Sequence, residues 1–346
     1  MRVLLNGVGR IGKAILRIAN STEKFEIVAI NEINSNVKNI AYSINYDSTY
    51  GQFDDKFKVN GKYLENSISK IKVLNKKDIL NIDFEKLNID IVIDASGSKV
   101  DIKKLKELPL KALFLTHPNK DADINVILGV NEQNIDIKKD KIISTSSCNA
   151  TALLPVLKII EENFKIKYGN ITTIHPLLNH QKVLDSNCIG SSNRGIDCNF
   201  EFGRSSVQNI IPSKTTTIDA CSYVMNCIGS KKISSNSFRV PTATVGAIDI
   251  SLVVKQSCSK NALIELFEKN SKKQTDKVLL NSYDSMVSSD FQGENFTTIV
   301  DHRFTDVKKN KMIKLNVWYD NEWGYASKVV DIVDLYKKKL NIKDFK

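Results

Sequence analysis

Long apolar runs are missing from this sequence of 346 residues. The longest uninterrupted ones span only a handful of residues, so no transmembrane helix is expected. Strand-like residues begin at Arg2 without a preceding apolar segment and cleavage site, so we expect no secretory signal peptide. The six cysteines include no C-x-x-C pair, which predicts reduced thiols and a cytoplasmic location. No spacing of cysteine and histidine matches a zinc module, so we predict no metal site.

Nucleic-acid-binding motifs are also missing, although the chain is basic. It has 50 Lys and Arg residues against 39 Asp and Glu, a net charge of +11. Most of the excess is scattered lysine, which is typical of a solvated surface and suits anionic small molecules. Without a zinc finger, an RNA-binding motif or a basic stripe with interleaved aromatic residues, nucleic acid is not expected as the primary ligand. The length predicts about two domains.

Short apolar runs alternate with helical periodicity in the first half of the chain. Ile11, Ile15 and Ile18 share one face of a helix between the first two runs. Strands that alternate with helices predict a parallel sheet of βαβ units. The predicted strands are Arg2–Asn6, Phe25–Ile30, Ile89–Ala95, Ala112–Thr116, Val126–Val130 and Lys141–Ser144.

The second half of the chain has a different pattern. An apolar helix is predicted from about Cys148 to Phe164, and apolar residues alternate with period two at 248–254 and 313–317. This alternation favours a mixed or antiparallel sheet, and a helical stripe closes the chain at 329–336. Asp185–Asn199 is rich in Ser, Asn and Gly and predicts a loop. The fold class is therefore α/β with two different sheets.

A G-x-G-x-x-G motif from Gly7 to Gly12 leaves the first strand and opens a helix. Gly7 allows a tight turn, Gly9 lets the backbone approach a pyrophosphate, and Gly12 lets helix and strand pack closely. The helix N-terminus favours the anion. Glu32, at the end of the second strand, would accept from ribose hydroxyls and repel a 2′-phosphate, which predicts NAD rather than NADP. A purely structural glycine turn is the alternative interpretation.

Cys148 is the candidate nucleophile because it lies where a strand meets the long apolar helix. The helix dipole stabilises a thiolate there, so we expect a lowered pKa for Cys148. A thiolate can attack an aldehyde carbonyl with the help of a base, which His175 could supply from the end of a strand. The spacing alone fits a buried core cysteine and a core histidine equally well.

Ordered motifs along nearly the whole chain resemble the phosphorylating glyceraldehyde-3-phosphate dehydrogenase family. They lie at residues 6–12, 28–32, 46–51, 147–149, 172–175, 208–212, 239–242 and 318–325. The resemblance implies a Rossmann NAD-binding domain with a parallel sheet at 1–147, to which a C-terminal helix at 320–346 returns. It also implies a catalytic domain with a mixed or antiparallel sheet at 148–319, and a homotetramer.

The resemblance also implies a role for each matched residue. Cys148 is the nucleophile, His175 the base, and Asn321 the residue that holds the nicotinamide carboxamide. NAD contacts are expected at Asn6, Gly7, Gly9, Arg10, Ile11, Gly12, Asn31, Glu32, Ser96, Thr116, Asn321 and Tyr325, and substrate contacts at Ser147, Asn149, Thr215, Thr216 and Arg239. The reaction would pass through a thiohemiacetal and an acyl thioester, which phosphate or water releases.

The residues around the phosphate positions depart from the family pattern. Asn149 and Ala150 stand where the family usually has two threonines, and Thr216 stands where it has a glycine. Leu178 and His180 replace a threonine and an aspartate. Leu178 lacks the hydroxyl donor of a threonine, and the side chain of Thr216 hinders close approach of an anion to the backbone. The rate is therefore expected to depend only weakly on inorganic phosphate.

Three functions stay open from the sequence. The preferred one oxidises a small phosphorylated aldehyde, glyceraldehyde 3-phosphate, to 1,3-bisphosphoglycerate, as in glycolysis. Erythrose 4-phosphate is the alternative, because residues 31–33, 116–118 and 175–185 look more like the erythrose-4-phosphate dehydrogenases, which often hydrolyse the thioester. The third is a catalytically weak paralogue that binds NAD or RNA, and the retained nucleophile, base, arginine and asparagine argue against it.

Overall fold

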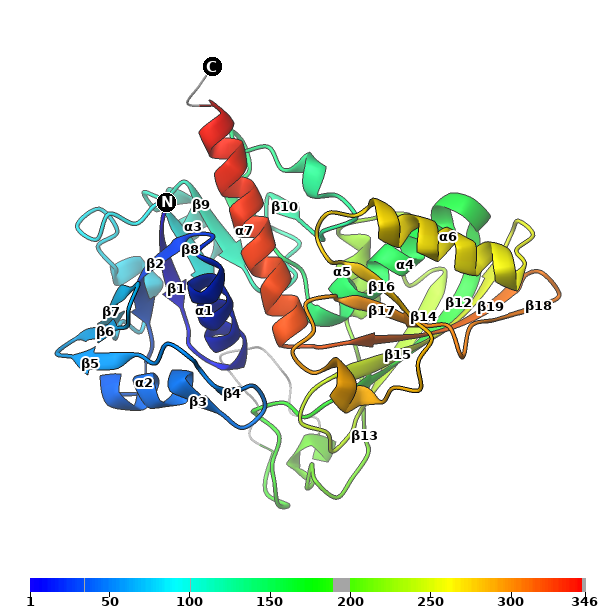
Figure 1. The fold of residues 1–346 in the computed structure, drawn as a ribbon, viewed down its shortest axis with the longest axis horizontal. Helices are drawn as coiled ribbons and strands as arrows, with labels where there is room; N and C mark the ends of the chain where they lie inside the picture. Colours follow the sequence, from blue (N-terminus) through cyan, green and yellow to red (C-terminus); the bar gives the residue numbers. More distant parts are fainter. Residues whose placement is uncertain (34, 100, 189–199, 344–346) are drawn as a thin grey trace. The chain divides into compact units, whose positions relative to one another are not determined.

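The computed structural model describes residues 1–33, 35–99, 101–188 and 200–343 (Figure 1). They form two compact units, each with its own sheet. Unit 1 contains Met1–Val126, Glu132–Ser146 and Ala326–Lys346, and unit 2 contains Ile127–Asn131 and Ser147–Tyr325. The α/β fold class with two different sheets is confirmed.

Unit 1 is built on a nine-stranded sheet in the order β10-β11-β9-β8-β1-β2-β7-β6-β5. All pairs from β10 to β7 are parallel, whereas β5–β6 and β6–β7 are antiparallel. The strands are β1 (Arg2–Asn6), β2 (Glu26–Asn31), β5 (Lys58–Asn60), β6 (Tyr63–Glu65), β7 (Lys70–Leu74), β8 (Ile91–Asp94), β9 (Ala112–Leu115), β10 (Ile124–Asn125) and β11 (Ile142–Ser144). The short β3 (Tyr46–Asp47) and β4 (Gly51–Gln52) pair separately.

The central strands of unit 1 are apolar on both faces, as expected of parallel strands covered on both sides. The helical segments of this unit are α1 (Arg10–Thr22), α2 (Val37–Asn45), α3 (Ile102–Glu107), η1 (Ile79–Asn81), η2 (Glu132–Asn134) and most of α7 (Trp323–Lys343). The predicted stripe at 329–336 is confirmed: Tyr336 of α7 packs edge-on against Phe114 of β9, with ring centroids 5.5 Å apart.

One predicted strand of the first half is wrong. Residues 128–130 form a turn, and residues 126 and 127 lie outside any helix or strand. The Asn131 side chain accepts a hydrogen bond from Ile127 N at 2.9 Å, and Val130 N donates to Ile127 O at 3.1 Å. Gly129 adopts a φ of +77°, which a strand does not allow. Val126 N still donates to Ser144 O of β11 at 2.8 Å, and the local bonds turn the chain after Ile127. Ile127 and Val130 therefore contribute to the core without continuing the strand.

Unit 2 is built on an eight-stranded mixed sheet in the order β13-β14-β12-β15-β19-β17-β16, with β18 paired to β19. β12–β14 and β16–β17 are parallel, and the other pairs are antiparallel. The strands are β12 (Ile166–His175), β13 (Ile211–Ser213), β14 (Ile233–Arg239), β15 (Gly246–Val254), β16 (Leu279–Ser282), β17 (Thr298–Asp301), β18 (Asp306–Lys308) and β19 (Met312–Tyr319). The predicted mixed sheet is confirmed.

The helices of unit 2 cover the buried side chains of this sheet. They are α4 (Cys148–Phe164), α5 (Thr217–Ser222) and α6 (Lys260–Lys273), with the short η4 (Phe200–Gly203) and η5 (Ser288–Phe291). Alternate residues of β15 are buried, so one face of the strand forms the core together with α4, most of which is buried. Residues 185–188 of the predicted loop lie outside any helix or strand, and the rest of that prediction lies outside the described residues.

The cysteines differ from the expectation in one place. Cys148, Cys221, Cys227 and Cys258 are free thiols. Cys188 is disulfide-bonded, so the prediction of reduced thiols throughout is wrong at this residue.

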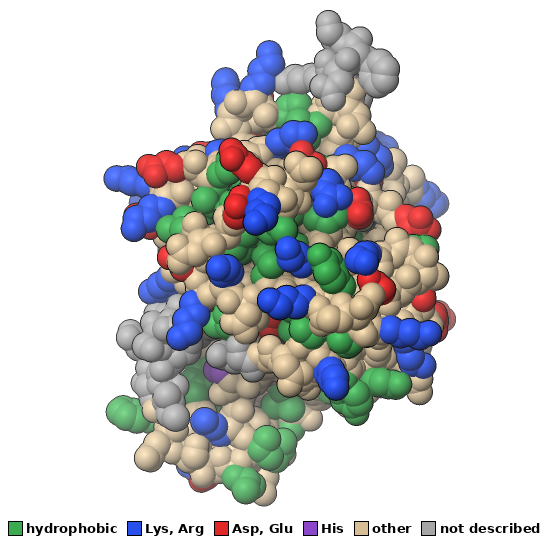
Figure 2. Space-filling model, turned by 90° about the vertical axis from the view of Figure 1, so that its left-hand side faces the viewer, with side chains coloured by type: hydrophobic (Ala, Val, Ile, Leu, Met, Phe, Trp, Pro, Cys, Tyr) green, Lys and Arg blue, Asp and Glu red, His purple; other side chains and the backbone are tan. Residues whose placement is uncertain are grey.

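The described surface and helices agree with the composition. On the face shown in Figure 2, Lys and Arg side chains are scattered among acidic and neutral ones rather than gathered into one stripe. None of the described helices is both long and apolar enough to cross a membrane.

Candidate active site

The helix α4 begins at Cys148 because the preceding residue caps it. Ser147 has extended backbone angles, and its hydroxyl oxygen accepts from Ala150 N at 3.3 Å. Its carbonyl oxygen accepts from Thr151 N at 2.8 Å. A serine in this conformation is a favoured N-cap, so the turn from strand to helix is fixed locally. Cys148 is therefore the first helical residue of unit 2.

His175 faces the Cys148 sulfur from the end of β12. The distance from Cys148 Sγ to His175 Nε2 is 3.9 Å, and the histidine is only 4% exposed. The other ring nitrogen, Nδ1, lies 2.8 Å from the carbonyl oxygen of Pro176. Because a carbonyl can only accept, Nδ1 carries the hydrogen and donates it, and the Nε2 lone pair is directed to the sulfur. This tautomer can accept the thiol proton.

Burial dominates the titration of both groups. It raises the pKa of the Cys148 thiol to about 11, although the positive charge of Arg239 and backbone hydrogen bonds act in the opposite direction. The expectation of a lowered pKa for Cys148 is therefore wrong, because close packing around the sulfur outweighs the favourable charges. Burial, assisted by the charge of Arg239, lowers the pKa of His175 to about 3. Both shifts act in the same sense, because burial disfavours the charged form of each group.

Asn149 joins three elements of unit 2 by hydrogen bonds. Its Oδ1 accepts from the Tyr319 hydroxyl of β19 at 2.6 Å and from Cys148 Sγ at 3.5 Å. Its Nδ2 donates to Thr217 Oγ1 of α5 at 3.2 Å. Thr215 and Thr217 share a further bond of 2.6 Å between their hydroxyl oxygens. The predicted substrate residues Asn149 and Thr215 thus lie in one polar chain next to the sulfur, whereas Thr216 is exposed.

Arg239 lies beside His175 because the two residues are register partners on the parallel strands β14 and β12. Its Nε and Nη1 atoms are buried and have no hydrogen-bond partner among the described residues. Burial lowers the pKa of Arg239 from its ordinary high value, which still leaves a charged guanidinium. A buried cation with two unsatisfied donors suits an anion that accepts two parallel hydrogen bonds.

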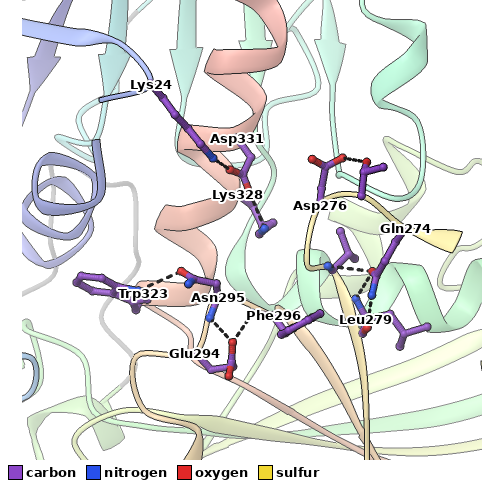
Figure 3. A network of polar contacts seen from close by, with 12 residues as sticks. Lys24, Gln274, Asp276, Leu279, Glu294, Asn295, Phe296, Trp323, Lys328 and Asp331 are labelled. Carbon is purple, nitrogen blue, oxygen red and sulfur yellow. Dashed lines mark hydrogen bonds and ion pairs between the residues drawn. The ribbon is translucent and has the colours of Figure 1, made fainter. Parts of the chain in front are cut away.

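Asn321 follows β19 in a segment that is tied down by hydrogen bonds within unit 2. Its Oδ1 accepts from Val245 N at 3.1 Å, which fixes the plane of the amide. The neighbouring Asp320 accepts from Gly293 N at 2.8 Å. Figure 3 shows Trp323 donating to Asn295 Oδ1, at 3.2 Å. Asn321 and the predicted cofactor residue Tyr325 are both buried.

The glycine loop of unit 1 has the conformation that its motif predicts. Gly7 has a φ of +89°, and a Cβ on it would lie 2.6 Å from Ser96 Cα. A Cβ on Gly12 would lie 2.0 Å from Gly7 O, so this glycine is needed for close packing. A Cβ on Gly9 would meet nothing within 4 Å. Among the described residues, no neighbour therefore requires a glycine at position 9. The absent side chain leaves room beside the start of α1.

A chain of polar side chains follows the carboxyl ends of the parallel strands in unit 1. Asn31 Nδ2 donates to Asn6 Oδ1 at 2.7 Å, and Asn6 Nδ2 donates to Asp94 Oδ1 at 2.9 Å. The same Asp94 oxygen accepts from Ser96 Oγ at 2.7 Å. Thr116 Oγ1 donates to the Asp94 carbonyl oxygen at 3.0 Å. Five strand-end residues thus meet where doubly wound α/β sheets bind their ligands.

These residues fit a dinucleotide. The N-cap Gly9 provides no side-chain cap, so the N–H groups at the start of α1 are directed to the open space beside it. The Glu32 carboxylate lies at the end of β2 and accepts from Val8 N at 2.7 Å, which ties the predicted ribose-binding acid to the glycine loop. Arg10 and Ile11 form the first turn of α1. The site residues of unit 1 can therefore hold a pyrophosphate and a ribose.

Sequence reasoning missed three polar residues of these sites. Asp94 is 2% exposed, and its only signal was a carboxylate at the end of an apolar strand. Tyr319 and Thr217 bond to Asn149 from positions far along the chain, so spacing could not reveal them. Among the described residues, no group of three or more His, Cys, Asp or Glu side chains could hold a metal ion.

Comparison with known proteins relates both units to one family. The family model for the NAD binding domain of glyceraldehyde 3-phosphate dehydrogenase matches residues 1–102, and the model for its C-terminal domain matches residues 147–321. Glyceraldehyde-3-phosphate dehydrogenase of Buchnera aphidicola subsp. Schizaphis graminum is 34% identical, over 98% of this chain and 99% of the relative. Glyceraldehyde-3-phosphate dehydrogenase 1 of Kluyveromyces lactis is 34% identical, over 96% and 99%. Glyceraldehyde-3-phosphate dehydrogenase 2 of Bacillus subtilis is 31% identical, over 96% of each chain.

Two glycine variants separate packing from ligand binding in the loop. Gly12→Ala is expected to lower the free energy of unfolding by about 1–3 kcal/mol, because the new Cβ would collide with Gly7 O. Gly9→Ala should leave that free energy within about 1 kcal/mol and weaken NAD binding. Urea unfolding and NAD titration of both variants test this difference. An equal loss of stability in both would contradict it.

Proposed function

This chain belongs to the glyceraldehyde-3-phosphate dehydrogenase family, and from this premise we propose that it oxidises glyceraldehyde 3-phosphate to 1,3-bisphosphoglycerate. The chain is an NAD-dependent dehydrogenase by its family, and the substrate is our inference from the names of its relatives. The observation that carries the proposal is the 3.9 Å approach of Cys148 Sγ to His175 Nε2, next to the unsatisfied guanidinium of Arg239.

Cys148 and His175 perform the covalent step in this proposal. The Cys148 sulfur forms a bond with the aldehyde carbon, and its proton passes to His175 Nε2, which gives a thiohemiacetal. The hydrogen bond from His175 Nδ1 to the Pro176 carbonyl oxygen holds the ring in place and stabilises the imidazolium. Burial and the charge of Arg239 lower the pKa of His175, which favours the neutral ring that can accept a proton.

The cofactor and the substrate phosphate have separate residues in the proposal. NAD, when bound, supplies the acceptor for the hydride that the thiohemiacetal carbon loses. The glycine loop and Glu32 of unit 1 would hold its pyrophosphate and adenine-side ribose, and Asn321 would hold the nicotinamide amide. Arg239 would bind the substrate phosphate through its two unsatisfied donors. The resulting thioester is released by attack of phosphate or water.

Erythrose 4-phosphate is the second candidate substrate, with hydrolysis as the release step. The observation that favours it is the reduced set of donors for a second phosphate. The Asn149 amide is occupied by Thr217, the Leu178 N–H donates to Gln181 Oε1 at 2.7 Å, and Thr216 is exposed without a capping bond.

We also propose that the protein is a cytoplasmic homotetramer, as the family resemblance implies. The free thiols of Cys148, Cys221, Cys227 and Cys258 suit a reducing compartment, and the disulfide at Cys188 is the exception.

Variants of the catalytic pair test the chemistry. Cys148→Ser is expected to abolish turnover and retain NAD binding, because it removes only the nucleophile. His175→Asn should slow acylation by about 10²–10⁴-fold with little change in NAD affinity. Stopped-flow measurement of the first turnover gives the acylation rate, and Cys227→Ser, at an exposed free thiol, is the control. A His175→Asn variant with normal acylation and weak NAD binding would overturn the assignment.

The cofactor preference depends on the charge of Glu32. Glu32→Gln keeps an acceptor for Val8 N but removes the negative charge that repels a 2′-phosphate. We expect the ratio of kcat/KM for NADP to that for NAD to rise by roughly tenfold or more. Glu32→Ala should show the same change with weaker binding of both cofactors, since the loop loses its anchor. Efficient use of NADP by the unaltered protein would show that Glu32 does not discriminate.

Two measurements test the phosphate sites: the KM for the phosphorylated aldehyde, and the dependence of thioester release on inorganic phosphate. Arg239→Ala should raise KM for the phosphorylated aldehyde by roughly 10–150-fold, because charge-assisted hydrogen bonds are lost. Unphosphorylated glyceraldehyde is the control substrate and should be affected much less. The steady-state rate should depend only weakly on phosphate or arsenate concentration for both aldehydes. Strong dependence that saturates at low phosphate would show a complete second site and exclude hydrolysis as the main release step.

A further inference from the structure

The Thr217 hydroxyl lies between Asn149 and Thr215, two of the residues predicted to bind substrate. Asn149 Nδ2 donates to Thr217 Oγ1 at 3.2 Å, and the hydroxyl oxygens of Thr217 and Thr215 lie 2.6 Å apart. Thr217 N also donates to Thr215 Oγ1, at 3.3 Å. Thr217 is only 3% exposed, whereas Thr215 is half-buried. A buried hydroxyl thus joins the residue after the nucleophile to the segment before α5.

The hydrogen bonds of this polar chain run in one direction. The Tyr319 hydroxyl donates to Asn149 Oδ1 at 2.6 Å, which leaves the Asn149 NH₂ group to bond with Thr217. An amide nitrogen only donates, so Thr217 Oγ1 accepts there and keeps its own hydrogen. Because buried hydroxyl groups are nearly always bonded, we assign that hydrogen to the bond with Thr215 Oγ1. The Thr217 hydroxyl is therefore fully used within the protein.

The bond from Asn149 to Thr217 removes a hydrogen-bond donor from the surroundings of Cys148. One of the two N–H groups of the Asn149 amide is held by Thr217 and is not available to a ligand. A phosphate is bound by donors, so each donor that the protein already uses weakens its binding. Water both donates and accepts, and it depends less on those donors.

The charges around the sulfur favour an anion. The positive charge of Arg239 acts on the Cys148 sulfur, and it outweighs the opposite effect of Glu322. The exposed Lys214 precedes Thr215 in the chain and adds a further cation. Charge therefore attracts phosphate to this part of unit 2, and the supply of free hydrogen-bond donors limits how tightly it binds.

We propose that Thr217 is a positioning residue that weakens the binding of the inorganic phosphate that attacks the Cys148 thioester, because its hydroxyl holds the Asn149 amide away from that anion. The inference rests on the proposed function in one respect, the thioester at Cys148. In the release step a phosphate oxygen bonds to the thioester carbon, the C–S bond breaks, and the sulfur leaves with the electron pair. Hydrogen phosphate gives an acyl phosphate and a proton, and water gives the carboxylic acid instead.

Protection of Cys148 by inorganic phosphate against iodoacetamide measures the phosphate affinity without any aldehyde. The Arg239→Ala background is used, so that the other anion-binding side chain does not contribute. Thr217→Val keeps the shape of the side chain and removes the hydroxyl, which frees the Asn149 N–H for phosphate. The phosphate concentration that gives half protection should fall by roughly tenfold. Thr217→Ser restores the hydroxyl, and its value should stay within about twofold of the parent.

A double variant identifies the donor that Thr217 holds. Adding Asn149→Ala to Thr217→Val removes the freed amide, so the half-protecting concentration should return at least to that of the parent. Thr275→Val is the matched control, because Thr275 is an exposed threonine after α6 whose hydroxyl donates to Asp276 Oδ2 at 3.0 Å. An unchanged value in Thr217→Val, an equal fall in Thr217→Ser, or a fall that survives Asn149→Ala would overturn the proposal.

The release step is followed separately with NAD and glyceraldehyde 3-phosphate. The first turnover, measured as NADH formed before phosphate is added, reports thioester formation. In Thr217→Val the phosphate concentration that gives half the maximal steady-state rate should again fall by roughly tenfold. A first turnover followed by an unchanged phosphate dependence would overturn the role of Thr217 and leave the proposed reaction intact. Absence of a first turnover in the unaltered protein would contradict the proposed function, and the protection measurement then decides on Thr217.

Discussion

The hydrogen bond from His175 Nδ1 to the Pro176 carbonyl oxygen determines what the rest of the catalytic unit can do. It fixes the tautomer, and with it the direction of the Nε2 lone pair toward Cys148. The backbone on the same residue is anchored as well, because Val240 N donates to His175 O at 3.0 Å. This bond between neighbouring chain segments also keeps Arg239 beside the histidine. The base and the anion-binding cation are thus positioned by the ends of two paired strands, and the nucleophile by the start of α4.

Much of the fold could be predicted because its signals are local. The apolar strands of unit 1 are bounded by turn residues, and α4 begins at a serine that caps it without help from elsewhere. Residues 126–130 misled the prediction because apolar content is common to strands and buried turns. The side chain of Asn131, which closes that turn, gives no periodic signal. Local sequence signals therefore predicted the start of α4 and most strands of unit 1. The prediction failed at 126–130, where the Asn131 side chain closes a turn in place of strand pairing.

The candidate site was predictable in its residue types and much less in its electrostatics. The place of Cys148 at a helix start follows from the sequence, whereas its pKa depends on packing by β12, β14 and β19, which come later in the chain. The same reason hid Tyr319, which reaches Asn149 across 170 positions. Asp94 escaped notice because its partner Asn6 lies on another strand, 88 positions earlier in the chain. The pKa values and hydrogen-bond partners of the site residues depend on contacts between strands, so the sequence of one strand does not predict them.

The three glycines of the first loop are held by different requirements, and this has an evolutionary consequence. Gly7 and Gly12 are needed by the polypeptide itself, because a methyl group on either would collide with neighbouring backbone. Gly9 borders open space, so only a ligand that binds at the N-terminus of α1 requires a glycine at this position. Under relaxed selection for cofactor binding, a descendant of this chain would drift first at Gly9 and keep Gly7 and Gly12 for as long as it folded. A substitution at Gly9 alone would therefore identify the descendants in which the loop still folds but no longer binds the cofactor.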